Sequence, residues 1–331
     1  MTVEKQAEEF RSVFDKLQNE IGRVIVGSTG TVEAVLTCIF AGGHCLLEGV
    51  PGLGKTMLVK TISEALDLKF SRIQFTPDLM PADIIGTNML IEDDKGHRQM
   101  EFRAGPIFAN IVLADEINRA TPKTQSALLE AMQEHTVSVA RTVHKLEEPF
   151  FVLATQNPIE MDGTYPLPEA QLDRFLLKVA VEFPSREDLT KILDRTTTRE
   201  VATGNNVMDG HEIRKWQGFV RDVVAAPQVT DYAVRLVLAT QPSTEYATDM
   251  VKKYVRFGSS PRGAQALLLA AKVQALRAGR FNVSFADIQQ TALHALRHRV
   301  LVNFEADAEG VISDQIIQGI LDGVKTAELV A

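Results

Sequence analysis

The chain has 331 residues, of which 45% are hydrophobic and 24% charged, and its formal net charge is -8. These are the proportions of an ordinary globular protein, and the length suggests about two domains. The acidic balance does not favour non-specific binding to nucleic acid, although a local basic groove stays open. No apolar run is long enough to span a bilayer, and the N-terminus is polar and charged. We therefore expect a cytoplasmic protein without membrane insertion.

The first segments of the chain read as helix, helix and strand. Phe10, Phe14, Leu17 and Ile21 recur at helical spacing and predict an amphipathic helix. A second apolar helix over Ala34–Ala41 is followed by a short buried strand at residues 44–47. The two cysteines, at positions 38 and 45, lie in these apolar segments without metal-ligand spacing. They are predicted to be small buried hydrophobes in a reducing compartment.

From there to about Pro184, short apolar strands alternate with helical patterns, which is typical of a parallel sheet with helices on both faces. Beyond Pro184 only helical patterns follow, separated by Gly, Asn and Pro. The sequence thus predicts an α/β core over residues 1–184 and an all-helical domain over residues 185–331. The further core strands are expected at Phe70–Phe75, Ile111–Ala114, Phe150–Ala154 and Phe175–Val181.

A complete P-loop pattern, GVPGLGKT, starts at Gly49. It follows the strand at 44–47 and precedes the apolar helical run Met57–Leu66, which is the context that a phosphate-binding loop requires. Glycines let backbone N–H groups close on phosphate oxygens at a helix N-terminus. The lysine of the pattern reaches the β- and γ-phosphates, and its threonine hydroxyl is a Mg²⁺ ligand. The predicted ATP-binding residues here are Gly49, Pro51, Gly52, Leu53, Gly54, Lys55, Thr56 and Met57.

Two carboxylates end the strand that begins at Ile111. Asp115 at a strand's carboxyl end can hold Mg²⁺ beside the P-loop, and Glu116 can polarise a water for in-line attack. The chain has neither the Asn-Lys-x-Asp motif of GTPases nor the Leu-Ser-Gly-Gly-Gln signature of transporter ATPases. A small-molecule kinase would rarely place Glu directly after the magnesium Asp and then add a helical domain. ATP hydrolysis is therefore the favoured reaction.

With these residues in place, the chain resembles the MoxR family of AAA+ ATPases over nearly all of its length. The run from Ala114 to Ala120, ADEINRA, is similar to the family's Walker B stretch, and its continuation TPKTQ matches as well. The resemblance implies a P-loop core with a helical lid, assembled as a homo-oligomer, typically a hexameric ring. It also implies a chaperone-like role in remodelling or maturing protein complexes, including cofactor or metal insertion, often with a partner that carries a von Willebrand A domain.

Five further residues carry over from the family by their local motifs. Asn157, in ATQNP, resembles sensor 1, whose amide bonds the attacking water or the γ-phosphate. Arg174, in LDRF, resembles the arginine finger that acts on a neighbouring subunit's γ-phosphate. Arg262, in SPR, resembles sensor 2, where Ser caps and Pro opens a lid helix and Arg touches phosphate. Val26 and Gly27 resemble the segment that packs on adenine.

The role of Arg119 stays open between a place at the subunit interface and a pair with an acidic neighbour. Two hairpins are predicted as insertions, one between residues 86 and 105 with its turn at 93–96, and one across residues 136–145. In relatives, such hairpins point toward the pore of the ring or toward one of its flat sides. They are therefore candidate contacts for a client protein. The alternative is that each is an ordinary surface hairpin without a binding role.

Two other functions stay open. One is a nucleic-acid motor: Arg141 and Lys145 lie near the second hairpin, but Glu134, Glu147 and Glu148 offset them, so nucleic acid is not the expected partner. The other is a nucleotide-gated scaffold with negligible turnover, which the intact Asp-Glu pair argues against.

Overall fold

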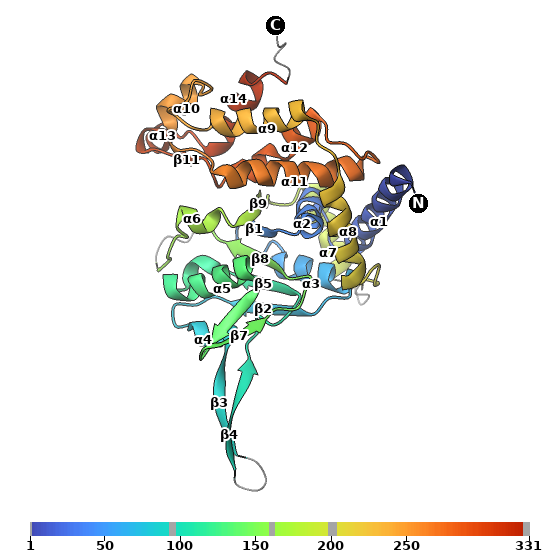
Figure 1. The fold of residues 1–331 in the computed structure, drawn as a ribbon, viewed down its shortest axis with the longest axis vertical. Coiled ribbons are helices and arrows are strands. Elements are labelled where there is room, and N and C mark those ends of the chain that lie inside the picture. Colours follow the sequence, from blue (N-terminus) through green and yellow to red (C-terminus); the bar gives the residue numbers. More distant parts are fainter. Residues whose placement is uncertain (1, 93–96, 159–162, 198–203, 327–331) are drawn as a thin grey trace.

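A five-stranded parallel sheet forms the centre of the molecule (Figure 1). The computed structural model describes residues 2–92, 97–158, 163–197 and 204–326. The strands follow the order β2-β5-β8-β1-β9, and each neighbouring pair runs parallel, as the sequence predicted. Their bounds are β1 (His44–Glu48), β2 (Phe70–Gln74), β5 (Ile111–Asp115), β8 (Phe151–Gln156) and β9 (Phe175–Ala180).

Helices cover both faces of this sheet, because alternate strand residues point into two separate apolar cores. Along β5, Ile111 and Leu113 belong to the first core, and Val112 and Ala114 to the second. The first core holds α1 (Val3–Val24), α2 (Thr29–Ala41), α3 (Lys55–Ala65) and α8 (Gly210–Asp222). The second core holds α4 (Pro81–Ile85) and α5 (Pro122–Glu134).

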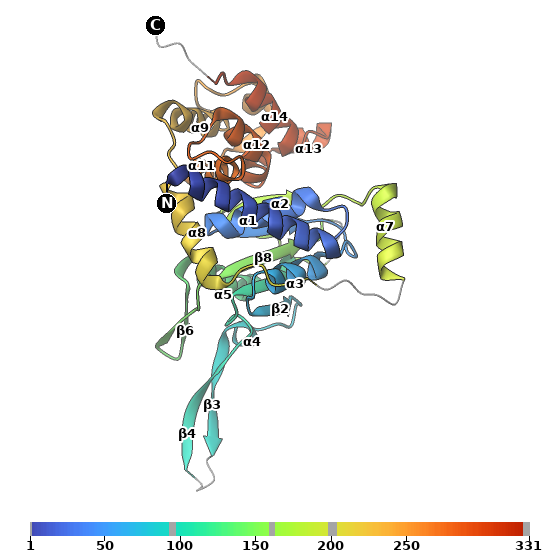
Figure 2. The same ribbon diagram turned by 90° about the vertical axis from the view of Figure 1, so that its right-hand side faces the viewer.

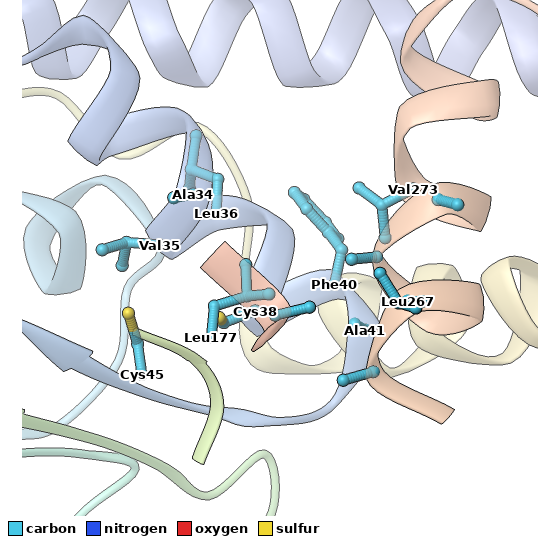
Figure 3. Close-up of a cluster of buried hydrophobic side chains, with 14 of the residues drawn as sticks. Ala34, Val35, Leu36, Cys38, Phe40, Ala41, Cys45, Leu177, Leu267 and Val273 are labelled. Carbon is cyan, nitrogen blue, oxygen red and sulfur yellow. The ribbon is translucent and has the colours of Figure 1, made fainter. Parts of the chain in front are cut away.

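Helix α2 lies between the sheet and α11 (Pro261–Arg277) of the C-terminal region. In Figure 3, Cys45 of β1 and Leu177 of β9 lie on one side of α2, and Leu267 and Val273 of α11 on the other. Cys38 and its neighbour Cys45 are both buried and free, as predicted. The α/β region and the C-terminal helices thus share one continuous apolar core.

The C-terminal region is helical, in agreement with the prediction, but it also contains a small antiparallel pair of strands, β10 (Val255–Phe257) and β11 (Leu301–Val302). Segments this short show no alternation that a sequence pattern could reveal. Helix α7 (Arg186–Thr196) stands apart at the side of the core (Figure 2). The remaining helices are α9 (Pro227–Ala239), α10 (Asp249–Tyr254), α12 (Phe285–Leu296), α13 (Phe304–Glu309) and α14 (Ser313–Gly323). In the part of the chain that the structure describes, no helix is long and apolar enough to cross a membrane.

Both predicted hairpins are present. Strands β3 (Gly86–Glu92) and β4 (Arg98–Ala104) form a long hairpin that projects from the end of the molecule opposite the C-terminal helices (Figure 1). Its predicted turn at 93–96 lies outside the described residues. The second hairpin pairs β6 (Thr136–Val139) with β7 (Thr142–Lys145). The ring of His144 stacks on Phe102 at 3.8 Å between centroids, so the two hairpins contact each other.

Candidate nucleotide-binding site

The predicted phosphate-binding loop connects β1 to α3, and Lys55 is the first residue of that helix. Gly52 and Gly54 have φ angles of 84° and 71°, in the left-handed region that glycine adopts without steric cost. Lys55 Nζ donates to the carbonyl oxygen of Gly49 at 2.6 Å. Burial lowers the pKa of Lys55, and nearby carboxylates oppose that shift. A second, longer bond of Lys55 Nζ goes to the carbonyl oxygen of Val50 at 3.4 Å, so the hydrogen bonds of this lysine within the described residues go to backbone carbonyls.

Asp115 ends β5 as a buried residue, 8% exposed, and its carboxylate is held by two partners. Thr155 Oγ1 donates to Oδ1 at 2.6 Å, and Arg72 Nη2 donates to Oδ2 at 2.7 Å. Thr56, the second residue of α3, and Asp115 line one cavity. A carboxylate and a hydroxyl are hard oxygen ligands of the kind that Mg²⁺ takes beside a nucleotide, so these residues fit that ion.

Glu116 has a φ of 56°, an uncommon left-handed conformation for a residue other than glycine. Its N–H donates to Thr155 Oγ1 at 2.8 Å, which holds the backbone in this conformation. Its Oε2 accepts from Gln74 Nε2 at 2.8 Å and lies 3.3 Å from Arg119 Nε. Arg119 thus pairs with an acidic neighbour, one of the two roles left open by the sequence. These contacts fix the Glu116 carboxylate at the carboxyl end of the sheet.

Two cavities meet at the phosphate-binding loop. We call the first, of about 450 Å³, the phosphate cavity, and the second, of about 510 Å³, the nucleoside cavity. The phosphate cavity is lined by Pro51, Gly52, Gly54, Lys55, Thr56, Met57, Arg72, Gln74, Asp115, Glu116 and Asn157. The four residues that line both are Gly52, Gly54, Lys55 and Met57. Asn157, 5% exposed, follows the end of β8, so the strand-end residues predicted from the sequence do face one space.

The nucleoside cavity is largely apolar, and α7 forms one of its walls through Leu189 and Ile192. Val26 and Leu53 also line this cavity, whereas Gly27 is not among its lining residues. Gly27 packs instead against α7, where a Cβ would lie 2.7 Å from Asp188 Cγ. At the far end of α7, Arg195 Nη1 donates to the carbonyl oxygens of Gly22 and Arg23, which anchors the helix to the end of α1.

Arg174 and Arg262 line neither cavity of their own chain. Arg174 Nη1 donates to the Leu129 carbonyl oxygen, and its buried Nε has no hydrogen-bond partner among the described residues. Arg262 is exposed in the first turn of α11, and its N–H donates to the capping Ser260 Oγ at 3.1 Å. Ser260 Oγ in turn bonds Asp173, the residue before Arg174. The two arginines therefore belong to one region, and neither lines the cavities at their own chain's phosphate-binding loop.

Comparisons with known proteins agree with this geometry. A family model described as "ATPase family associated with various cellular activities (AAA)" matches residues 44–177, and an AAA lid domain model matches residues 247–320. The chain is 41% identical over 319 residues to YeaC of Bacillus subtilis, with 96% of each chain covered. It is 41% identical over 305 residues to Chaperone MoxR1 of Mycobacterium tuberculosis, covering 92% of this chain and 80% of that protein. The chain belongs to the MoxR family of AAA+ ATPases.

A solved structure supports the same assignment for the whole fold. The crystal structure of a candidate ATPase from Cytophaga hutchinsonii superposes with a TM-score of 0.91 at 39% sequence identity, covering 98% of both chains. Core and lid of this MoxR-family protein therefore take the arrangement seen in that structure.

Three parts of this site were not predicted from the sequence: the pair Arg72 and Gln74, Thr155, and the wall formed by α7. Arg72 and Gln74 lie on β2, where the register pairs Gln74 with Asp115. Because the carboxyl ends of parallel strands meet at one edge, the position of Gln74 at the end of a predicted strand could have marked it. Thr155 lies within the sensor 1 motif, whose pattern indicates a role only for Asn157. The α7 wall had no local signal, since its apolar residues are equally suited to a lid helix.

Proposed function

We propose that this MoxR-family chain binds ATP in the two cavities and hydrolyses it. The observation that carries the proposal is the convergence of Lys55, Thr56, Asp115, Glu116 and Asn157 on the phosphate cavity. These residues come from the ends of two strands, β5 and β8, and from the N-terminus of α3, which is the constellation that phosphoryl transfer to water requires.

Each residue has a definite task in this proposal. The N–H groups of the phosphate-binding loop and the ammonium of Lys55 bind phosphate oxygens, so Lys55 exchanges the Gly49 carbonyl for a phosphate. Thr56 and Asp115 would hold Mg²⁺, which neutralises phosphate charge when bound. Glu116 takes a proton from the attacking water, and Asn157 orients that water. Gly49 and Pro51 shape the loop, and the adenosine packs in the nucleoside cavity against α7 and Val26.

A second copy of the chain completes the site in this proposal. Arg174 lines neither cavity of its own chain and carries a buried N–H without an acceptor among the described residues. Because Arg174 as a whole is only partly buried, its guanidinium can turn toward an anion supplied from outside, and a γ-phosphate of the adjacent subunit is that anion in this proposal. Arg262 would meet phosphate from the same side. Contacts of this head-to-tail kind close into a ring, and the family favours a hexamer.

The work done by hydrolysis is proposed to be chaperone-like remodelling or maturation of protein complexes in the cytoplasm. A chaperone name belongs to the 41% identical Mycobacterium tuberculosis relative, which supports this reading. The β3–β4 hairpin exposes Met89, Leu90, Ile91 and Met100, an adaptable apolar surface suited to a protein client. A von Willebrand A domain protein is the partner that we expect.

The variant Glu116→Gln tests both parts of the proposal. It keeps a side chain that accepts from Gln74 but removes the base, so phosphate release should fall by about 10²–10⁴-fold while ATP binding is retained. Purification of this variant with ATP or with ADP should recover a von Willebrand A protein or an immature enzyme only with ATP. Undiminished phosphate release would contradict the catalytic assignment. Recovery of nuclease-sensitive nucleic acid instead of protein would contradict the remodelling role.

A further inference from the structure

The carboxylate of Asp173 connects the arginine-finger segment to the lid. One oxygen, Oδ1, accepts from Arg299 Nε at 2.7 Å. The other, Oδ2, accepts from Ser260 Oγ at 2.7 Å, and the same hydroxyl accepts from the Arg262 N–H and caps α11. Asp173 lies directly before Arg174 in the chain. A single side chain thus contacts two parts of the lid while its backbone carries the proposed finger.

Arg299, which follows α12, is held completely within this junction. Its side chain is 2% exposed. Besides Asp173 Oδ1, its acceptors are four backbone carbonyls, of Asp173, Phe175, Leu176 and Ala295. A guanidinium has five N–H groups, so each of them has an acceptor. Three of these carbonyls belong to residues 173–176, and Arg299 therefore fixes the backbone on both sides of Arg174.

The rest of the junction leaves this segment little freedom to move. His298 Nε2 lies 3.1 Å from the Phe175 carbonyl oxygen, and both groups are buried. On the neighbouring strand face, α2 fills the space between β9 and α11 (Figure 3). Close-packed interiors transmit displacement rather than absorb it, so the start of β9 follows the lid. The position of Arg174, directly before β9, therefore also depends on the position of the lid.

We propose that Asp173 is a positioning residue for Arg174, which it holds at a fixed place relative to the lid through Arg299 and Ser260. This inference rests on the proposed function, in which Arg174 contacts the nucleoside triphosphate of a second copy of the chain. Its consequence is that the lid of one subunit sets how well that subunit's finger reaches the neighbour's nucleotide. Asp173 itself touches no nucleotide.

A double-mutant cycle on the full-length chain tests the inference, using ATP turnover at saturating subunit concentration. Arg174→Ala should lower kcat by about 10³-fold, the lower end of arginine-finger effects. Asp173→Asn keeps an acceptor for Arg299 but loosens the segment, and kcat should fall by about 10–100-fold with KM for ATP changed less than about twofold. The double variant Asp173→Asn/Arg174→Ala should match Arg174→Ala alone, because Asp173 acts only through the finger.

The outcomes separate the two proposals. Losses that multiply in the double variant, or an unchanged kcat in Asp173→Asn, would overturn the positioning role while leaving the finger intact. An unchanged kcat in Arg174→Ala would overturn the finger and the positioning role together. A defect of Asp173→Asn that disappears at high subunit concentration would reduce its role to assembly and would also overturn the inference.

If Asp173→Asn does not fold, Ser260→Ala tests the positioning role in its place, again by comparing the loss of kcat with and without Arg174. It removes the hydroxyl bond to Asp173 but leaves the Arg299 pair, so a loss of a few fold is expected, absent in the Arg174→Ala background. Thr248→Ala is the matched control, since Thr248 Oγ1 caps α10 in the same lid by accepting from the Val251 N–H. Thr248→Ala should leave kcat unchanged; an equal loss there would assign the Ser260 effect to capping and overturn the inference.

Discussion

Charged side chains at the phosphate and nucleoside cavities differ from those around Arg174 in how exposed they are and in how completely they are hydrogen-bonded. At the cavities, Lys55 bonds a backbone carbonyl and Arg72, whose side chain is 46% exposed, pairs with Asp115. Around Arg174, the guanidinium of Arg299 is almost completely buried with every N–H group bonded. We call these regions the nucleotide side and the finger side.

The difference follows from what each side meets during the reaction. In the proposed reaction, the nucleotide side must exchange its internal partners for phosphate oxygens and Mg²⁺ each time ATP binds, so replaceable partners suit it. In the same proposal, the finger side meets an anion that another subunit has already placed. Stabilisation of developing charge is greatest when the donors are fixed beforehand, because no reorganisation is then required. A MoxR-family subunit thus combines an adaptable half-site with a rigid one.

The largest expected effect is a difference in the free energy of unfolding between a substitution on the finger side and one on the nucleotide side. Arg299→Met should lower the free energy of unfolding by about 3–5 kcal/mol, because it leaves a partly buried Asp173 carboxylate and several carbonyls without their donor. The same change at Arg72→Met should cost less, about 1–2 kcal/mol, since the Asp115 carboxylate keeps its hydrogen bond from Thr155 and faces the phosphate cavity. Urea unfolding of both variants measures the contrast. Equal losses would show that the two sides are not held differently.

A second prediction asks whether the rigid part extends into β1, the strand that leads to the phosphate-binding loop. His44 Nδ1 accepts from the Val152 N–H and its Nε2 lies 3.0 Å from the Met132 carbonyl oxygen, which fixes a neutral ring. Burial lowers the pKa of His44 to about 4. Below about pH 6.5, His44 is protonated in the unfolded chain but stays neutral in the folded chain. The free energy of unfolding therefore decreases as the pH falls toward 4.

This term should amount to about 2 kcal/mol between pH 7 and pH 5. The variant His44→Asn removes the titrating ring, so its stability should fall less steeply with acid than that of the unchanged chain. The exposed His211→Asn serves as the control and should keep the original slope. Thermal unfolding of the three proteins at pH 7 and pH 5 measures how much stability each loses with acid. Parallel slopes in all three proteins would mean that His44 is free to charge in the folded state.

The smallest expected effect concerns the α7 wall of the nucleoside cavity. Ile192→Ala should raise KM for ATP roughly fivefold, because about 1 kcal/mol of apolar packing on the adenosine is lost. The kcat at saturating ATP should stay within about twofold, since no group of the phosphate cavity changes. Leu193→Ala, on the same helix but 59% exposed, is the control and should leave both constants unchanged. Equal KM values for the two variants would remove α7 from the nucleotide site.

Local patterns explain how much of this molecule could be predicted. The parallel sheet, the hairpins and the residues facing the phosphate cavity, except Arg72 and Gln74, followed from apolar runs, strand ends and one glycine-rich motif, each contained in a few consecutive residues. The pairs of Arg72 with Asp115 and of Asp173 with Arg299 could not be predicted, because their members lie 43 and 126 residues apart. Only the order of the strands and the packing of the lid bring such residues together. The division at residues 184 and 185 stays a prediction.

The central claim is that Arg174 of one subunit completes the nucleotide site of another, and a mixture of two inactive variants tests it most directly. Lys55→Ala lacks a working phosphate-binding loop but keeps its finger, and Arg174→Ala has the reverse defect. Mixed at equal amounts, they should recover about a quarter of the original ATP turnover, because that fraction of interfaces joins an intact loop to an intact finger.

The control mixture pairs Lys55→Ala with Glu116→Gln. Both changes lie in the same half-site, so an interface with a working loop always lacks its base and turnover should stay at the background level. Co-purification of two differently tagged variants verifies that mixed oligomers form. Recovery in the first mixture and none in the second is the predicted result. No recovery in the first mixture, although mixed oligomers have formed, would contradict the account.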